Sequence, residues 1–153
     1  MGLISNGTTL LDAGALDSGI ATGDMILIKT LTASSSANLT FVHGTSSVVL
    51  DGTYKSYVFK YIDIHPASVA QLTVNFRDGG TDYDATKTST AFNPYHQEDD
   101  SAAGIIYREA WDLAQGAGDQ IIAQELGNGA DESASGYLHL FNPSSTTFVK
   151  HYM

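Results

Sequence analysis

The sequence predicts an all-β protein, folded as an antiparallel β-sandwich or a jelly-roll-like module. Short runs of alternating apolar and polar residues, rich in aromatic and β-branched side chains, recur along the 153-residue chain. Clusters of Gly, Asn and Asp separate these runs, and no long segment has the periodicity of an amphipathic helix. About eight short strands at spacings of roughly 8–12 residues are typical of sandwiches and closed barrels.

The chain has the length of one domain, which we place at residues 24–153. Residues 1–23 are rich in Gly, Asp and Thr, and we expect an extended N-terminal arm with one short strand near residues 8–11. Residues 24–32 place apolar side chains on both faces of an extended chain, which predicts a buried strand. Residues 39–43 and 47–50 are expected to pair around a Gly-Thr-Ser turn.

The central part of the chain predicts two further strand regions. Residues 54–65 alternate aromatic and aliphatic side chains and predict the longest strand, which Pro66 ends because proline cannot donate to a ladder. Residues 72–77 alternate apolar and polar side chains, and an Asp-Gly-Gly turn follows them. The expected return strand, residues 83–90, is polar and therefore predicts a sheet edge or a subunit contact.

The third quarter of the chain is less regular. Residues 93–104 contain Pro, Gly and several acids, and they predict a loop. Residues 105–111 predict a strand by alternation. Residues 119–126 predict two helical turns, because Asp119 is a helix start signal and Gly127 a stop signal.

The C-terminal segment is the clearest hairpin signal. Residues 136–141 and 147–152 are alternating runs on either side of an Asn-Pro-Ser-Ser-Thr loop. The last strand runs directly into the C-terminus, so it is either held inside a sheet or followed by further residues in the natural product. We favour the second expectation, a C-terminal truncation.

Composition and charge restrict the function classes. Only 16% of residues are charged, and the abundant Ser, Thr, Gly and Asn suit uncharged sheet faces that pack against copies of the same chain. The net charge of −10 and the scattered Lys and Arg argue against nucleic acid as a partner. No apolar run is long enough to cross a membrane. The absence of a secretion signal predicts synthesis in a cytoplasm.

No motif in the sequence predicts a catalytic site or a cofactor. Glu98, Asp99 and Asp100 are adjacent acids, but nothing apolar surrounds them to raise a pKa, so we expect an exposed loop and no enzyme. Asp78, Asp82 and Asp84 are weak candidates for a calcium site, since their spacing departs from the EF-hand pattern. The histidines are dispersed, and no metal ligand set is expected beyond a remote His139–His151 pair.

Aromatic side chains are the best lead to a binding surface. Tyrosine and tryptophan bury a rigid apolar body with a polar tip, which suits subunit contacts, while stacking on a sugar ring is the alternative. Filling of the core is a third outcome, and sequence alone does not assign the sheet faces. The candidates for an interface or a glycan-stacking surface are Tyr57, Tyr61, Tyr95, Tyr107 and Trp111.

Three segments carry a resemblance to a known group of proteins. Residues 41–66, the DGGTDYDATKT segment and residues 136–153 resemble β-rich virion proteins of tailed phages, especially marine ones. The resemblance is one of composition and short sequence segments, and it includes no catalytic motif. It implies a capsid-decoration, fibre or tail-associated component, made in the host cytoplasm and located in the virion. Members of the group continue past the terminal hairpin with another apolar strand.

The expected function is therefore that of a structural virion protein. We expect a homo-oligomer, a trimer or a larger array, because the polar strand and the terminal strand leave edges to be covered. The further partners are other virion proteins. A carbohydrate- or receptor-binding module that contacts a host surface glycan is the alternative function.

Overall fold

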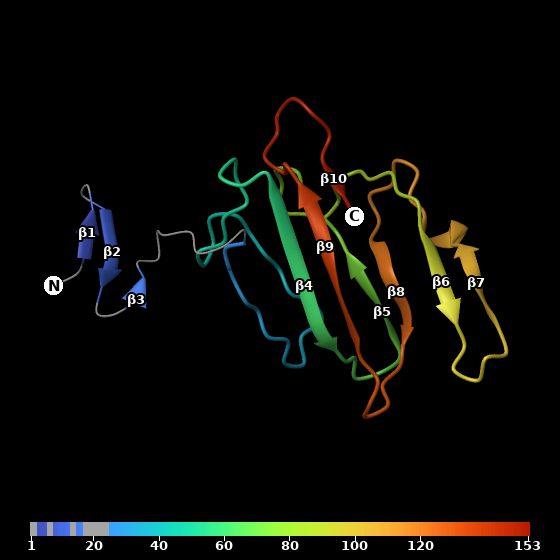
Figure 1. Cartoon of the computed structure of the whole chain (residues 1–153). Coiled ribbons are helices and arrows are strands. Elements are labelled where there is room, and N and C mark those ends of the chain that lie inside the picture. Colours follow the sequence, from blue (N-terminus) through green and yellow to red (C-terminus); the bar gives the residue numbers. More distant parts are fainter. Residues whose placement is uncertain (1–2, 6–7, 13–14, 17–24) are drawn as a thin grey trace. The chain divides into compact units, whose positions relative to one another are not determined.

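The computed structural model describes residues 3–5, 8–12, 15–16 and 25–153 (Figure 1). Within these ranges the structure consists of strands and loops, with a single 3-10 turn, η1 (Glu109–Trp111). The described strand pairs are antiparallel. The predicted all-β, antiparallel fold class is confirmed at this level.

The described strands form small sheets. A three-stranded sheet has the order β10-β9-β4, and two-stranded sheets are formed by β5 with β8 and by β6 with β7. A further three-stranded sheet near the N-terminus has the order β1-β2-β3, and its β2 matches the short strand expected near residues 8–11. The expectation of a single strand in the arm is wrong, because β1 and β3 flank β2 there. Residues 1–2, 6–7, 13–14 and 17–23 of the expected arm lie outside the described residues. The bounds are β1 Leu3–Ser5, β2 Thr8–Asp12, β3 Ala15–Leu16, β4 Ser56–Ile64, β5 Ala70–Val74, β6 Phe92–His96, β7 Ala103–Tyr107, β8 Gln120–Leu126, β9 Ala134–Phe141 and β10 His151–Tyr152.

The chain divides into two compact units, one of Met1–Tyr57 with His139–Met153 and the other of Val58–Leu138. In the first unit Tyr57 is 4% exposed, and its hydroxyl donates a hydrogen bond to the carbonyl of Asp51 at 2.9 Å. Strand β10 pairs with β9 in the register His151 to Phe141. The predicted C-terminal hairpin is thus confirmed, and its last strand is held in a sheet.

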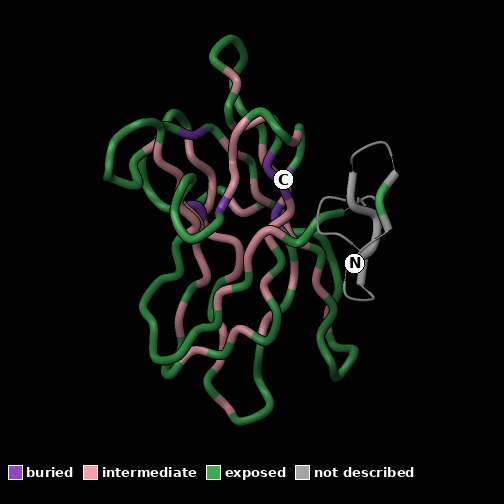
Figure 2. The backbone as a smooth tube through the Cα atoms, turned by 90° about the vertical axis from the view of Figure 1, so that its left-hand side faces the viewer, coloured by how far each residue is buried: buried purple, intermediate pink, exposed green. Residues whose placement is uncertain are grey.

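The second unit contains the pairing of β5 with β8, from Ala70 opposite Leu126 to Val74 opposite Gln120. Few described side chains are fully buried, and most of the backbone is intermediate or exposed (Figure 2). Lys87 and Gln120 are buried polar residues of this unit. The assignment of residues 24–153 to a single sandwich domain stays a prediction.

Two expected strand regions in the first unit are wrong. Residues 25–32 are not a strand, and Met25, Ile26 and Leu27 are exposed. An apolar run becomes a strand only where another strand offers its hydrogen-bonding edge, and no described strand pairs with these residues. Residues 39–43 and 47–50 form no ladder either. The turn lies where expected, but the amide of Leu50 donates to Nδ1 of His43, so a side chain takes the place of the ladder partner.

The expected hairpin of residues 72–77 with 83–90 is wrong. Strand β5 pairs with β8, and residues 83–90 belong to no strand. They make an isolated bridge between Lys87 and Gly116, and the amide of Ala85 donates to the carbonyl of Phe76 without forming a ladder. The two helical turns expected at residues 119–126 are also wrong, because these residues are β8. Its apolar side chains are half-buried against β5, and this non-local pairing prevails over the local helix signal of Asp119 and Gly127.

The loop expected at residues 93–104 is wrong at both ends. Strands β6 and β7 form a hairpin there, and only residues 97–102 connect them. The strand expected over residues 105–111 is correct as far as Tyr107, after which the chain enters η1. Pro94 hides β6 from a reading of the sequence, because proline ordinarily argues against a strand. It is tolerated here because the position of its missing N–H faces an open edge.

Candidate interaction surface

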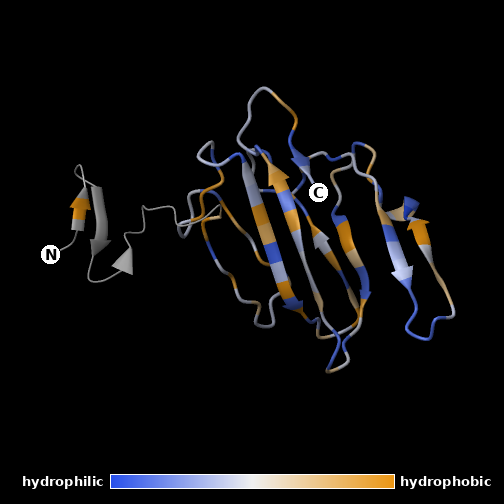
Figure 3. Cartoon of the chain, in the orientation of Figure 1, coloured by the Kyte–Doolittle hydropathy of each residue, from blue (hydrophilic) through white to orange (hydrophobic). Residues whose placement is uncertain are grey.

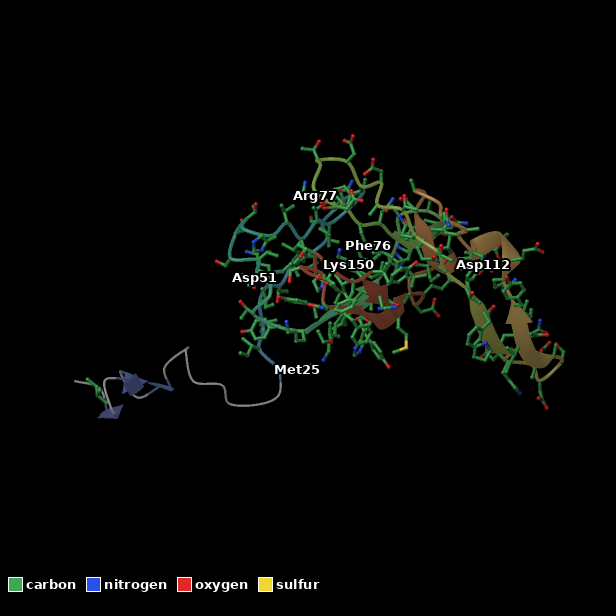
Figure 4. All side chains as sticks on the ribbon, turned by 90° about the horizontal axis from the view of Figure 1, so that it is seen from above. Met25, Asp51, Phe76, Arg77, Asp112 and Lys150 are labelled. Carbon is green, nitrogen blue, oxygen red and sulfur yellow. The ribbon has the colours of Figure 1, made fainter. Side chains whose placement is uncertain are left out.

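The β6–β7 ribbon presents an apolar stripe on one of its faces. The register places Phe92 opposite Tyr107 and Pro94 opposite Ile105, and cross-strand partners project to the same side. Phe92 is 66% exposed, Ile105 75% and Tyr107 59%. The ribbon is a two-stranded sheet, and side chains stand on both sides of it (Figure 4). The stripe of Phe92, Pro94, Ile105 and Tyr107 is an open apolar surface.

The opposite face of the ribbon is closed by a local contact. Tyr95 lies opposite Gly104, and a Cβ built on this glycine would be 3.3 Å from Cε1 of the tyrosine ring. The ring therefore lies over the backbone of Gly104, where a larger residue would crowd it. Tyr95 is half-buried by this contact.

The turn after β7 is held in place by contacts of Arg108 and Trp111. Nε of Arg108 donates to Oδ1 of Asn93 at 2.6 Å, and its guanidinium lies 5.2 Å from the ring centroid of Trp111. The indole Nε1 of Trp111 donates to Oε1 of Gln124 on β8 at 2.7 Å. These contacts connect the ribbon to the β5–β8 sheet and hold the half-exposed indole in one orientation.

Tyr107 is tied to the same turn through Asp112, which lies just past η1 (Figure 4). The Tyr107 hydroxyl donates to Oδ2 of Asp112, while Oδ1 of Asp112 accepts from the amide of Ala91 at 2.6 Å. The hydrogen bond to Asp112 raises the pKa of Tyr107 above its ordinary value of 10.0. The phenol is therefore neutral at physiological pH and serves as a donor.

The five candidate aromatic residues do not lie on one face. Tyr57 is buried in the first unit, and Tyr61 lies against the backbone of Gly136. Tyr95, Tyr107 and Trp111 belong to the β6–β7 ribbon and its following turn. Phe92, Pro94 and Ile105 are not among the candidates that the sequence suggests for a surface. The sequence places Pro94 in an expected loop and Ile105 in an expected strand, and no local signal puts the three on one face.

The acidic loop connects β6 and β7. Glu98, Asp99 and Asp100 are exposed, as expected from the sequence. The side chain and amide of Ser101 donate to Asp99 and lower its pKa below 3.8. His96 lies 3.1 Å from Asp100 in an exposed pair, which contributes little to stability.

The calcium candidates are not gathered into a ligand set. Asp78, Asp82 and Asp84 are exposed residues of the segment that follows β5. Among the described residues, no three His, Asp or Glu side chains lie close enough to hold a metal ion. His151 pairs with Phe141, and His139 exchanges hydrogen bonds with Met153, so the two histidines are diagonal neighbours and not direct partners.

A polar cluster around Lys87 was not anticipated from the sequence. Nζ of Lys87 donates to Oδ1 of Asn75 at 2.5 Å and to the carbonyl of Ala85 at 2.6 Å. Nδ2 of Asn75 donates to Oδ1 of Asp119 at 2.7 Å. Burial lowers the pKa of Lys87, and the nearby charges of Asp119 and Asp84 oppose this effect. With its donors satisfied, the cluster is a structural tie between β5 and the segment before β8.

Comparison of the chain with protein-family models, curated proteins and solved structures finds no match. In the part of the chain that the structure describes, no helix is long and apolar enough to cross a membrane.

Proposed function

We propose that the protein is a structural virion protein: a multimeric decoration, fibre or tail-associated component of a tailed phage. In this proposal its antiparallel sheets pack as a sandwich or jelly roll, and its partners are its own copies and other virion proteins. The chain is made in the host cytoplasm and is incorporated into the particle there. The all-β architecture and the phage-like phrases of the sequence support the proposal.

The single observation that carries the proposal is the exposed β7 strand. All five of its residues are exposed and uncharged, in a chain with a net charge of −10. Water-exposed apolar strands of this kind mark protein contacts, because burial of their apolar area stabilises an assembly by about 25 cal/mol per Å². An assembly protein needs such a surface.

Quantitative mass spectrometry of purified particles tests the proposal. We expect the chain in many copies per particle of the phage that encodes it, retained after washing at high salt. Detection of the chain only in the infected-cell lysate, with none in the particles, would contradict a structural role.

Binding of a host surface glycan is the second candidate, and the setting of Trp111 favours it. The half-exposed indole is flanked by Arg108 and Gln124, so an apolar stacking surface lies beside polar groups. Because Trp111 is the only tryptophan of the chain, its fluorescence reports this site directly. A saturable change on titration with polysaccharide, lost on Gln124→Ala and retained on Tyr83→Phe, would support glycan binding, and a flat titration would exclude the tested glycan.

A further inference from the structure

The β6–β7 ribbon has one hydrogen-bonding edge that is open and one that is impaired. The amide of Gln97 donates to the carbonyl of Ala102, and the amide of Arg108 donates to the carbonyl of Ala91. Backbone groups alternate between the two sides of an antiparallel strand, so Gly104 and Ile106 also face β6. The N–H and C=O groups of Ala103, Ile105 and Tyr107 therefore face outward. No described strand or backbone hydrogen bond reaches them.

The edge of β6 is a poorer template than the edge of β7. Its outward residues are Phe92, Pro94 and His96, by the same alternation. Pro94 has no N–H to donate, which removes the central donor of that edge. Strand β7 keeps all of its donors, and its residues are orange to pale in the hydropathy colouring (Figure 3). An additional strand is therefore accepted at β7 and not at β6.

We infer that β7 pairs with β7 of a second copy of this chain, antiparallel and about a two-fold axis at Ile105. This inference rests on the proposed function and names the contact through which copies assemble. The product is a continuous four-stranded sheet in the order β6-β7-β7-β6. The two-fold axis places Ile105 opposite Ile105 of the second copy and Ala103 opposite Tyr107, so that all outward groups are paired.

Side-chain size favours this register. Ala103, Ile105 and Tyr107 project to the apolar face of the ribbon, together with Phe92 and Pro94. Pairing the large Tyr107 with the small Ala103 leaves room for the tyrosine ring, while the two Ile105 side chains meet at the centre. The apolar stripes of the two copies then merge into one surface.

Charge favours the antiparallel arrangement of two copies over the parallel one. The acidic loop lies at the beginning of β7, and Arg108, the only Lys or Arg between residues 92 and 111, follows its end. In the antiparallel pair each acidic loop lies near Arg108 of the other copy, next to the exposed Glu109, and away from the other acidic loop. The ladder from Ala103 to Tyr107 spans about 14 Å at a rise of about 3.4 Å per residue. The two loops are thus separated by more than the physiological Debye length of about 8 Å. A parallel pair would bring the two loops together.

A single cysteine tests the two-fold pairing directly, because the chain contains no cysteine. The Cα atoms of hydrogen-bonded partners lie about 5.5 Å apart, which is within the range that a disulfide spans. Under mild oxidation of the full chain, we expect Ile105→Cys to give a covalent dimer in most of the protein. The matched control is Val69→Cys, at an apolar residue that is 63% exposed and distant in sequence from the ribbon. It should give at least several-fold less dimer.

Two further substitutions of Ile105 test the association of copies in solution, without a covalent cross-link. Ile105→Pro removes an outward N–H and leaves the bonds to β6 in place, so the mass in solution at tens of micromolar should fall at least two-fold. Ile105→Lys should have the same effect, and Val69→Lys should have none. Circular dichroism checks that each variant is folded.

The outcomes separate this inference from the function on which it rests. A multimer whose mass is unchanged by both Ile105 variants, with no cross-link at Ile105→Cys, overturns the β7 pairing and leaves the virion role standing. A wild-type monomer overturns the pairing and the multimeric part of the proposed function together. Protection of the Ile105 amide from hydrogen exchange in a monomeric chain would show that another segment of the same chain covers β7, and would also overturn the pairing.

Discussion

Lys87 is the one buried cationic side chain in the part of the chain that the structure describes. Its ammonium group is removed from water, and this cost is offset by hydrogen bonds to Asn75 and to the carbonyl of Ala85. Because burial lowers its pKa from 10.5, the unfolded chain binds more protons than the folded chain between the folded pKa and 10.5. Its contribution to stability therefore rises with pH through that window.

Lys87→Ala should lower the free energy of unfolding by about 1–3 kcal/mol, because buried acceptors lose their donor. Urea denaturation followed by circular dichroism measures the loss. The control is Lys60→Ala, at an exposed position of β4, which should change the free energy by less than about 0.5 kcal/mol. Equal effects of the two substitutions would show that the Lys87 cluster is not a structural tie.

Asp112→Asn should return the pKa of Tyr107 toward 10.0, because the carboxylate both accepts a hydrogen bond from the neutral phenol and repels the phenolate charge. Because the pKa of Tyr107 is higher in the folded than in the unfolded chain, the hydrogen bond contributes fully to the free energy of unfolding below pH 10. This contribution is lost as pH rises through the folded pKa. An NMR titration of the Tyr107 ring measures the midpoint, with Asp84→Asn as a control that leaves it unchanged. A midpoint that does not move in Asp112→Asn would show that another group raises it.

At the scale of elements, the close approach of β4 and β9 depends on a missing side chain. A Cβ on Gly136 would lie 2.5 Å from the hydroxyl oxygen and 2.7 Å from Cζ of Tyr61. The amide of Asp63 donates to the hydroxyl of Ser135 at 2.9 Å, next to this contact. The ring of Tyr61 thus packs directly on the β9 backbone, and the strand cannot carry a side chain there.

Gly136→Ala should destabilise the protein by about 1–3 kcal/mol, the usual cost of overpacking, since the Tyr61 ring must leave its position. Gly118→Ala is the matched control, because no atom lies within 4 Å of a Cβ built there. In a Tyr61→Ala background the effect of Gly136→Ala should largely disappear, as a double-mutant cycle of thermal midpoints would show. Additive effects in that cycle would exclude the contact as the cause.

The strands themselves differ in how far local pattern specified them. The alternation in β4 and β9 was sufficient, because each has one face buried and one exposed. Strand β8 carried a helix signal at both ends, and only its pairing with β5 made it a strand. Strand β6 contains proline, which the open edge tolerates.

At the scale of the whole molecule, assembly must overcome a net charge of −10 per chain. Like-charged copies repel one another, and the repulsion is screened over about 8 Å at physiological salt. Contacts that join copies are therefore expected on uncharged surfaces such as β7, with the acids kept apart. This expectation agrees with the low overall content of charged residues.

Deletion of residues 2–23 should leave the remaining chain folded, because the strands β4 to β10 pair without them. We expect the far-UV circular dichroism of the sheets formed by β4 to β10 to be retained. As a hypothesis, the arm connects copies or anchors the chain on the particle, so light scattering should show loss of assemblies larger than the β7 dimer. Unfolding of the shortened chain would show that the arm belongs to the core.

The sequence alone determined the all-β class, the turn positions, the longest strand and the C-terminal hairpin. These features depend on period-two alternation and on turn residues, which act between neighbours in the chain. It also identified Tyr107 and Trp111 as surface candidates and Glu98 to Asp100 as an exposed loop.

Apart from the C-terminal hairpin, the pairing of the strands came only from the tertiary structure. Whether residues 72–77 pair with 83–90 or with 119–126 depends on non-local burial and on the satisfaction of backbone groups, which local pattern does not encode. The same holds for the stripe of Phe92, Pro94, Ile105 and Tyr107. Its members lie on two strands that only the register brings side by side, because side chains share a face through cross-strand pairing and not through sequence proximity.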